Sequence, residues 1–148
     1  MYVAATDGYN MNEIVDELRA VNQAGYASIE LPDEDQLVLV QEQILLHLPA
    51  DLKDFLLNVS DIVYGSIEPV TVSDEHLATY LPDMTFVAWD RGMPREYIPI
   101  CEHSQGYYFI AQEGYISIWS AKTGVNEKLY WDSIWDWCED IWLKNKGR

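Results

Sequence analysis

The residue types best suited to chemistry lie together at Cys101, Glu102 and His103, and a second cysteine is Cys138. A thiol beside an imidazole can act as a nucleophile with its base, and two cysteines with a histidine can bind zinc. Zinc sites usually carry closely paired ligands such as C-x2-C, and this chain has no second pair. Neighbouring strand residues also point to opposite faces, so Glu102 cannot join the other two. We therefore predict no metal site, and a small hydrolase built on Cys101 and His103 is only a third hypothesis.

Sequence motifs for nucleotide or cofactor binding are absent from the chain. It contains neither G-x-x-x-x-G-K-[ST] nor G-x-G-x-x-G. Carboxylates are abundant, but in so acidic a chain two neighbouring acids are expected by chance and do not identify a general acid or base. We therefore predict that the protein is not an enzyme, with no catalytic residues and no cofactor.

The net charge of the chain limits the kinds of molecule that it can bind. Nine basic and 25 acidic residues give a formal charge of −16, and Arg19 and Lys53 are the only basic residues before position 55. Nucleic-acid affinity comes largely from Lys and Arg that displace counterions, so we predict neither nucleic acid nor an anionic membrane as ligand. The same charge would speed the encounter with a basic protein. Alternatively, it serves only to keep the protein soluble.

The sequence also predicts the cellular compartment of the protein and its number of domains. The first residues, MYVAATDGYNMNE, lack the basic and long apolar regions of a signal peptide, and no run of 18 apolar residues could span a bilayer. Two cysteines do not form a disulfide framework. We expect one domain, residues 1–148, in the cytoplasm; the sequence leaves the oligomeric state open.

Helical patterns dominate the first sixty residues. We expect a helix from Asn12, as its cap, to about Ala24, with Gly25 at its exit. Asp33 and Gln36 have capping-box spacing for a second helix, which Pro49 should end. Its apolar stripe is Leu37, Val40, Ile44 and Leu48, and the next helix, "ADLKDFLLNV", should bury Leu52, Phe55, Leu56 and Val59. Two short β-like pieces, "DIVYG" and "EPVTV", and a helix from about Pro82 to Arg91 should follow.

Residues 97–119 read as three strands joined by two tight turns. A two-residue turn at Glu113-Gly114 would pair Ala111 with Ile116, and the turn at 103–106 would pair Ile98 with Ala111. These registers place one core face at Ile98, Ile100, Phe109, Ala111, Ile116 and Ile118. The other face would carry Tyr97, Cys101, Tyr108, Ile110, Tyr115, Ser117 and Trp119. Either a helix covers that second face or it is an exposed binding surface, since Tyr and Trp suit half-wet places.

Four of the six tryptophans lie in the stretch "YWDSIWDWCEDIW", residues 130–142. At about 100° per residue, the indoles, Cys138, Ile134, Ile141 and Tyr130 fall on one arc, and the acids fall on the opposite side. We therefore predict an amphipathic C-terminal helix that packs its indoles inward, with Trp137 at the edge of the arc as the most exposed of them.

The phrases "LPADLKDFLLNVSDIVYG", "YIPICEHSQGYYFIAQEGYISIWS" and "WDSIWDWCEDIWL" occur in the order seen in the SUKH superfamily, the Smi/Knr-type proteins. The resemblance spans roughly residues 30–143. It implies an α+β fold in which a central, mainly antiparallel sheet, with a C-terminal β-meander, is flanked by N-terminal helices and a Trp-rich C-terminal helix.

If the chain is a bacterial member, the resemblance implies an immunity protein that binds and neutralises a secreted toxin, often a nuclease, whereas the related fungal proteins look like signalling scaffolds. For this chain the resemblance implies an immunity protein that binds and neutralises such a toxin, and the formal charge of −16 favours a basic toxin domain. The alternative is a regulatory scaffold for an endogenous partner. On the second sheet face, we predict the protein-binding residues to be Tyr97, Tyr108, Tyr115, Ser117 and Trp119.

Overall fold

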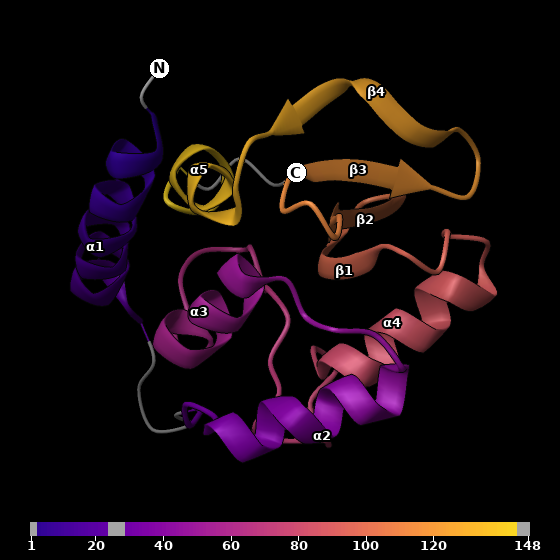
Figure 1. Ribbon diagram of the computed structural model, residues 1–148, viewed down its shortest axis with the longest axis horizontal. Helices are drawn as coiled ribbons and strands as arrows, with labels where there is room; N and C mark the ends of the chain where they lie inside the picture. Colours follow the sequence, from indigo (N-terminus) through magenta and orange to yellow (C-terminus); the bar gives the residue numbers. More distant parts are fainter. Residues whose placement is uncertain (1–2, 24–28, 145–148) are drawn as a thin grey trace.

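An antiparallel sheet of four strands lies beside a group of helices in the computed structural model, which describes residues 3–23 and 29–144 (Figure 1). The helices before the sheet are α1 (Val3–Val21), α2 (Glu34–Ile44), α3 (Ala50–Val59) and α4 (Leu81–Asp90). The sheet is a meander of β1 (Ile98–His103), β2 (Gly106–Ile110), β3 (Ile116–Ser120) and β4 (Gly124–Trp131). A helix, α5 (Ile134–Trp137), follows and continues as the π-helical turn η1 (Cys138–Trp142). The predicted α+β fold class is confirmed.

Helix α1 starts earlier than predicted. Asn12 is not its cap but lies within the helix, because the preceding segment, which includes Ala4 and Ala5, also adopts helical structure. Ile14 and Leu18 are buried, and α1 packs against α3 and α5. The predicted exit at Ala24 and Gly25 lies outside the described residues.

Helix α2 begins as predicted and ends early. The Asp33 side chain accepts a hydrogen bond from the Gln36 backbone N–H at 2.9 Å, and the Gln36 side chain accepts one from the Asp33 N–H at 3.0 Å. This is the capping box that the spacing predicted. The helix ends at Ile44 rather than at Pro49, because Leu45 adopts the left-handed conformation with φ 60° and ψ 38°. Leu48 is still buried, although it lies beyond the helix.

Helices α3 and α4 agree with the sequence. The four apolar side chains predicted to face inward from α3 are all buried. Pro82 lies in the first turn of α4, and Gly92 follows the helix with φ 115°, a conformation that favours glycine. The two predicted β-like pieces form only isolated bridges, including Pro69 with Cys101, which places that segment against the edge of β1.

The predicted β2–β3 register is wrong by one residue, whereas the predicted β1–β2 register is wrong at Ile98 and correct from Cys101 to His103. Ile110, not Ala111, pairs with both Ile98 and Ile116, so a five-residue loop joins β2 to β3. The loop is closed by hydrogen bonds from the Ala111 N–H to the Tyr115 carbonyl and from the Gly114 N–H to the Ala111 carbonyl, each 2.9 Å. A bulge between Pro99 and Cys101 also shifts β1. The side chains assigned to the second face therefore do not share one side of the sheet.

The C-terminal tryptophans pack inward as predicted, although the observed helix that carries them is shorter than the predicted one. Trp131 belongs to β4, a strand that the sequence analysis did not predict, and Ser133 caps α5 with its hydroxyl oxygen accepting from the Asp136 N–H. Trp135, Trp137 and Trp142 are buried around Phe55 and Tyr108. Trp137, expected to be the most exposed indole, is completely buried, and Tyr130, expected to be buried, is exposed.

Candidate functional site

Tyr108 is a core residue rather than a surface anchor. Its ring, 2% exposed, contacts the indoles of Trp131 and Trp137 with centroid distances of 5.8 and 5.3 Å. Burial raises the pKa of its hydroxyl to about 12. Helix α5 thus covers this side of the sheet, which confirms the first of the two alternatives for Tyr108. A partner could not reach the ring without opening the core.

Ser117 and Trp119 lie on the opposite side of the sheet from Tyr108 and are also buried. The Ser117 hydroxyl lies 2.8 Å from the Leu129 carbonyl and ties β3 to β4. The Trp119 indole stacks on Tyr107, at 22° between ring planes, and reaches the backbone turn at Gly92. Both side chains hold the sheet together, and binding through them remains an untested prediction.

Tyr97 and Tyr115 are the two predicted site residues that the structure brings together at the surface. Both are half-buried, and both rings contact Phe109. A hydrogen bond with the Tyr115 hydroxyl, with burial as the second cause, raises the pKa of Tyr97 to about 12. Tyr115 and Ser117 also line a shallow hollow of about 470 Å³ beside the exposed Tyr130. This hollow is the part of the predicted site that a partner could reach.

The cysteines are not activated. Burial raises the pKa of Cys101 to about 12 and raises the pKa of Cys138 well above its ordinary value. A nucleophilic cysteine needs the thiolate form near neutral pH, so burial works against the hydrolase hypothesis. Within residues 3–23 and 29–144, no group of three or more His, Cys, Asp or Glu side chains is arranged to hold a metal ion.

Several exposed apolar side chains lie on α2, on Leu45 directly after it, and on α4, and the two helices pack against each other (Figure 1). On α4, Phe86 and Val87 are 45% and 53% exposed and are flanked by exposed Asp83 and Asp90, at the i, i+3, i+4, i+7 spacing of one helix face. Together with exposed side chains on α2 and at Leu45, the residue that follows it, they make up what we call the acidic helix face: Val38, Leu39, Leu45, Phe86 and Val87, with Glu34, Asp35, Glu42, Asp83 and Asp90.

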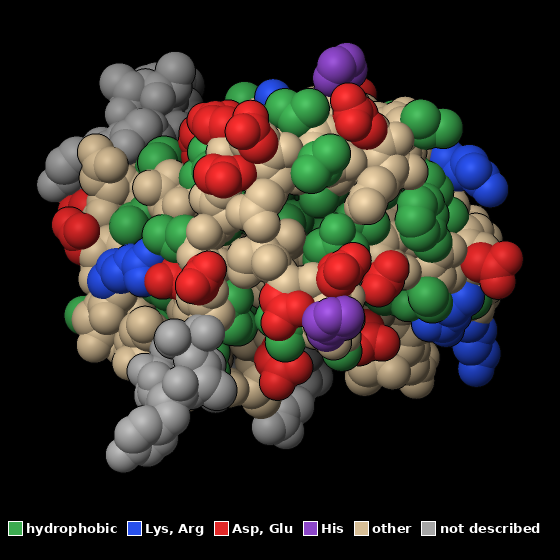
Figure 2. All heavy atoms as spheres, turned by 90° about the horizontal axis from the view of Figure 1, so that it is seen from below, with side chains coloured by type: hydrophobic (Ala, Val, Ile, Leu, Met, Phe, Trp, Pro, Cys, Tyr) green, Lys and Arg blue, Asp and Glu red, His purple; other side chains and the backbone are tan. Residues whose placement is uncertain are grey.

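Leu45 is the most unusual member of the acidic helix face. Its side chain is 86% exposed, and its backbone is left-handed, a conformation that costs a non-glycine residue about 1–2 kcal/mol. With Val38 and Glu42 it lines a shallow groove of about 330 Å³. In Figure 2, which views the molecule from the side of α2, acidic side chains are interspersed with hydrophobic ones, and Lys and Arg lie towards the edges. Neither helix packing nor turn chemistry accounts for a leucine at this position.

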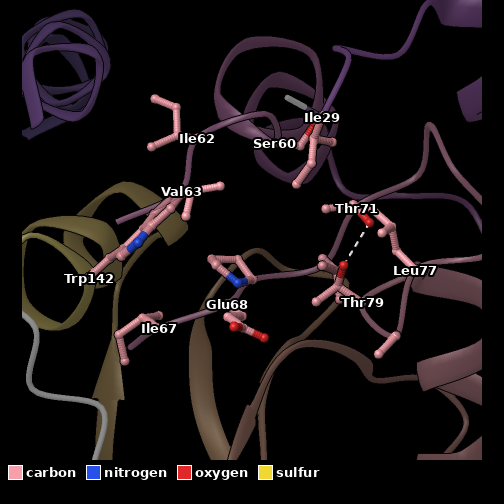
Figure 3. A pocket seen from close by; sticks show the side chains of 13 residues that line it. Ile29, Ser60, Ile62, Val63, Ile67, Glu68, Thr71, Leu77, Thr79 and Trp142 are labelled. Atoms are coloured by element: carbon pink, nitrogen blue, oxygen red, sulfur yellow. Dashed lines mark hydrogen bonds between the residues drawn. The ribbon is translucent and has the colours of Figure 1, made fainter. Parts of the chain in front are cut away.

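A cleft separate from the acidic helix face opens between the 60–71 segment, the 77–79 segment and Trp142 (Figure 3). Its inner part, about 220 Å³, is lined mainly by apolar side chains. A second hollow of about 420 Å³, lined by Glu102 and His103, shares Glu68, Ala78 and Thr79 with the first, so the two adjoin. We call the two together the Glu68 cleft.

Comparison with known proteins identifies the family. Residues 11–143 match the family model SUKH_5, described as SMI1-KNR4 cell-wall. The chain belongs to the SUKH family. This SUKH protein is similar to a protein from Pseudomonas syringae pv. tomato, whose crystal structure gives a TM-score of 0.85 and 47% sequence identity, covering 90% of this chain and 98% of that chain. A search of curated proteins gave no match.

Sequence reasoning missed the acidic helix face of this SUKH protein. The spacing of Asp83, Phe86, Val87 and Asp90 could have revealed it, because those four positions fall on the side of α4 opposite the buried Leu81, Met84 and Ala88. No helix in the described part of the chain has the length and apolar character needed to cross a bilayer.

Proposed function

We propose that this SUKH protein is a non-enzymatic cytoplasmic immunity protein that binds and neutralises a basic toxin domain, and that the toxin docks on the acidic helix face. The observation that carries the proposal is the exposure of Leu45, Phe86 and Val87 among acidic side chains. Clustered apolar side chains on a water-soluble surface are typical of places where another protein binds. The surrounding carboxylates favour a partner with a basic surface.

Acidic and apolar side chains would contribute differently to the complex. The carboxylates of Glu42, Asp83 and Asp90 would attract a basic surface and raise the association rate, an effect that salt screens. Phe86 and Leu45 would be buried on docking and would slow dissociation, as desolvated apolar anchors do at interface centres. Neutralisation needs no chemistry from this chain, because covering a basic substrate-binding surface is enough to block a nuclease.

The proposal is tested by isolating the partner and measuring protection. Tagged protein is co-purified from its native cells, the partner is identified by mass spectrometry, and the partner domain is expressed with and without this chain. We expect a basic domain that arrests growth alone and forms a stoichiometric, inactive complex. A partner that is harmless alone would instead favour the regulatory scaffold. A toxic partner that stays active when bound would contradict neutralisation.

A further inference from the structure

The Glu68 cleft combines an apolar end with an acidic end. Ile62, Ile67, Val70, Leu77 and Trp142 line the inner part, as Figure 3 shows for most of them. A cavity of about 150 Å³ already holds a benzene ring, so about 220 Å³ has room for one leucine or phenylalanine side chain. The outer part carries the carboxylates of Glu68 and Glu102. No Lys or Arg is among the described residues that line either part.

The walls of the cleft are held in place without a ligand. The Thr71 N–H donates to the Thr79 carbonyl at 2.9 Å, and the two threonine hydroxyls lie 2.9 Å apart (Figure 3). The Val70 N–H donates to the Ile100 carbonyl at 2.8 Å, which fixes the same segment to β1. Trp142 is held by a 3.3 Å hydrogen bond from its indole N–H to the Tyr64 carbonyl. A preformed cleft binds without first paying the entropy of ordering its walls.

Neither Glu68 nor Glu102 forms an ion pair with any of the described residues, and both side chains are exposed. Two unpaired carboxylates beside an apolar cavity favour a ligand with an apolar body and a positive group. Because the cleft is open to solvent along Glu68 and Ala78, a segment of another chain could enter it.

We propose that the Glu68 cleft binds a segment of the partner protein in which a leucine or phenylalanine stands beside a lysine or arginine. The apolar side chain enters the inner part, and the cation lies between Glu68 and Glu102. The identity of the partner rests on the proposed function, whereas the ligand chemistry of the cleft does not. The segment would be a second contact, separate from the acidic helix face.

The test uses a peptide probe and needs no partner. Acetyl-Gly-Leu-Lys-Gly-amide and its Leu-Glu counterpart are titrated into the full chain, followed by NMR. We expect shifts at the Thr79 amide and the Trp142 indole, with at least fivefold tighter binding of the lysine peptide. Equal binding of the two peptides, or no shift at these positions at millimolar concentration, would overturn the inference.

Variants separate the cleft from general charge effects. The double variant Glu68→Gln with Glu102→Gln should bind the lysine peptide at least fivefold more weakly. The control, Glu75→Gln with Glu96→Gln, makes the same charge change at exposed acids outside the cleft and should have little effect on binding. Ala78→Trp places an indole in the shared part of the cleft and should abolish binding. Full binding by Ala78→Trp would refute the cleft. Because the peptide assay involves no toxin, its failure would not contradict the proposed function. Equally, a failure of the toxin test would not contradict peptide binding in the cleft.

Discussion

The indole N–H of Trp131, the last residue of β4, donates a 2.9 Å hydrogen bond to Oδ2 of Asp140 in the terminal π-helical turn. This bond ties the meander to the C-terminal helix across a reversal of the chain. Lys144 lies 3.8 Å from the other carboxylate oxygen, so Asp140 is held from two sides.

Trp131→Phe should destabilise the protein modestly, because it removes the donor and leaves Asp140 partly buried. Hydrogen bonds to charged groups contribute about 1.5–3 kcal/mol, and partial exposure of Asp140 lowers our expectation to about 1 kcal/mol. Urea denaturation measures the change. An unchanged midpoint would show that water replaces the indole without loss.

Trp135→Ala should cost about 3–5 kcal/mol of unfolding free energy, the range of large-to-small core changes. Its indole is buried against Phe55, at a centroid distance of 6.0 Å. Tyr130→Ala, at an exposed aromatic five residues earlier, is the matched control and should change stability by less than about 0.5 kcal/mol. Similar losses in the two variants would contradict the burial of the C-terminal indoles.

Stability should fall at alkaline pH. Burial raises the pKa of Cys101 from 9.0 to about 12 and that of Tyr108 from 10.0 to about 12. The folded state therefore keeps protons that the unfolded chain releases, so the unfolding free energy is full below about pH 9 and decreases as pH rises towards 12. Cys101→Ala should reduce the slope between pH 9 and 10. An identical slope in that variant would mean that the thiol does not titrate differently on unfolding.

Leu45→Gly should stabilise the fold and weaken binding at the same time. Glycine adopts φ 60° without the steric cost that leucine bears, and little packing is lost from a side chain 86% exposed. We expect a net gain of about 0.5–1 kcal/mol in thermal or chemical unfolding, because the relief of left-handed strain, about 1–2 kcal/mol, exceeds the extra entropy that glycine gives the unfolded chain. Faster dissociation of the partner from this more stable variant would show that Leu45 serves binding. A loss of stability would instead reveal a packing role.

The sequence predicted those parts of the fold that depend on local chemistry. The capping box at Asp33 and the buried stripe of α3 follow from residues a few positions apart, and both are confirmed. The inward packing of Trp135 and Trp142 followed from helical periodicity. In each case the contacts that determine the structure are short-range in sequence or lie on the apolar side of one amphipathic helix.

The strand register could not be predicted in the same way. Glu113-Gly114 suggested a two-residue turn, but the five-residue loop satisfies its own backbone groups through Ala111 and Tyr115. That choice shifted every pairing between β2 and β3 by one and placed Tyr108 and Trp119 on the same predicted face, when they lie on opposite sides of the sheet. Side chains alternate between the two faces of a sheet, so one register error changes the predicted face of every residue in the strand. The candidate site was misplaced for this reason.

The central claim, that a basic partner docks on the acidic helix face, is tested most directly by matched charge reversals. The first variant, Glu42→Lys with Asp90→Lys, reverses two charges of that face near the C-termini of α2 and α4, where lysine is tolerated. The control, Asp16→Lys with Glu17→Lys, makes the same change of charge on α1, on another side of the molecule (Figure 1). The measurement is the partner's association rate at several salt concentrations. We predict at least a tenfold slower association for the first pair and a much smaller change for the second. Equal slowing by both pairs would show that net charge alone steers the partner and that the acidic helix face is not the docking site.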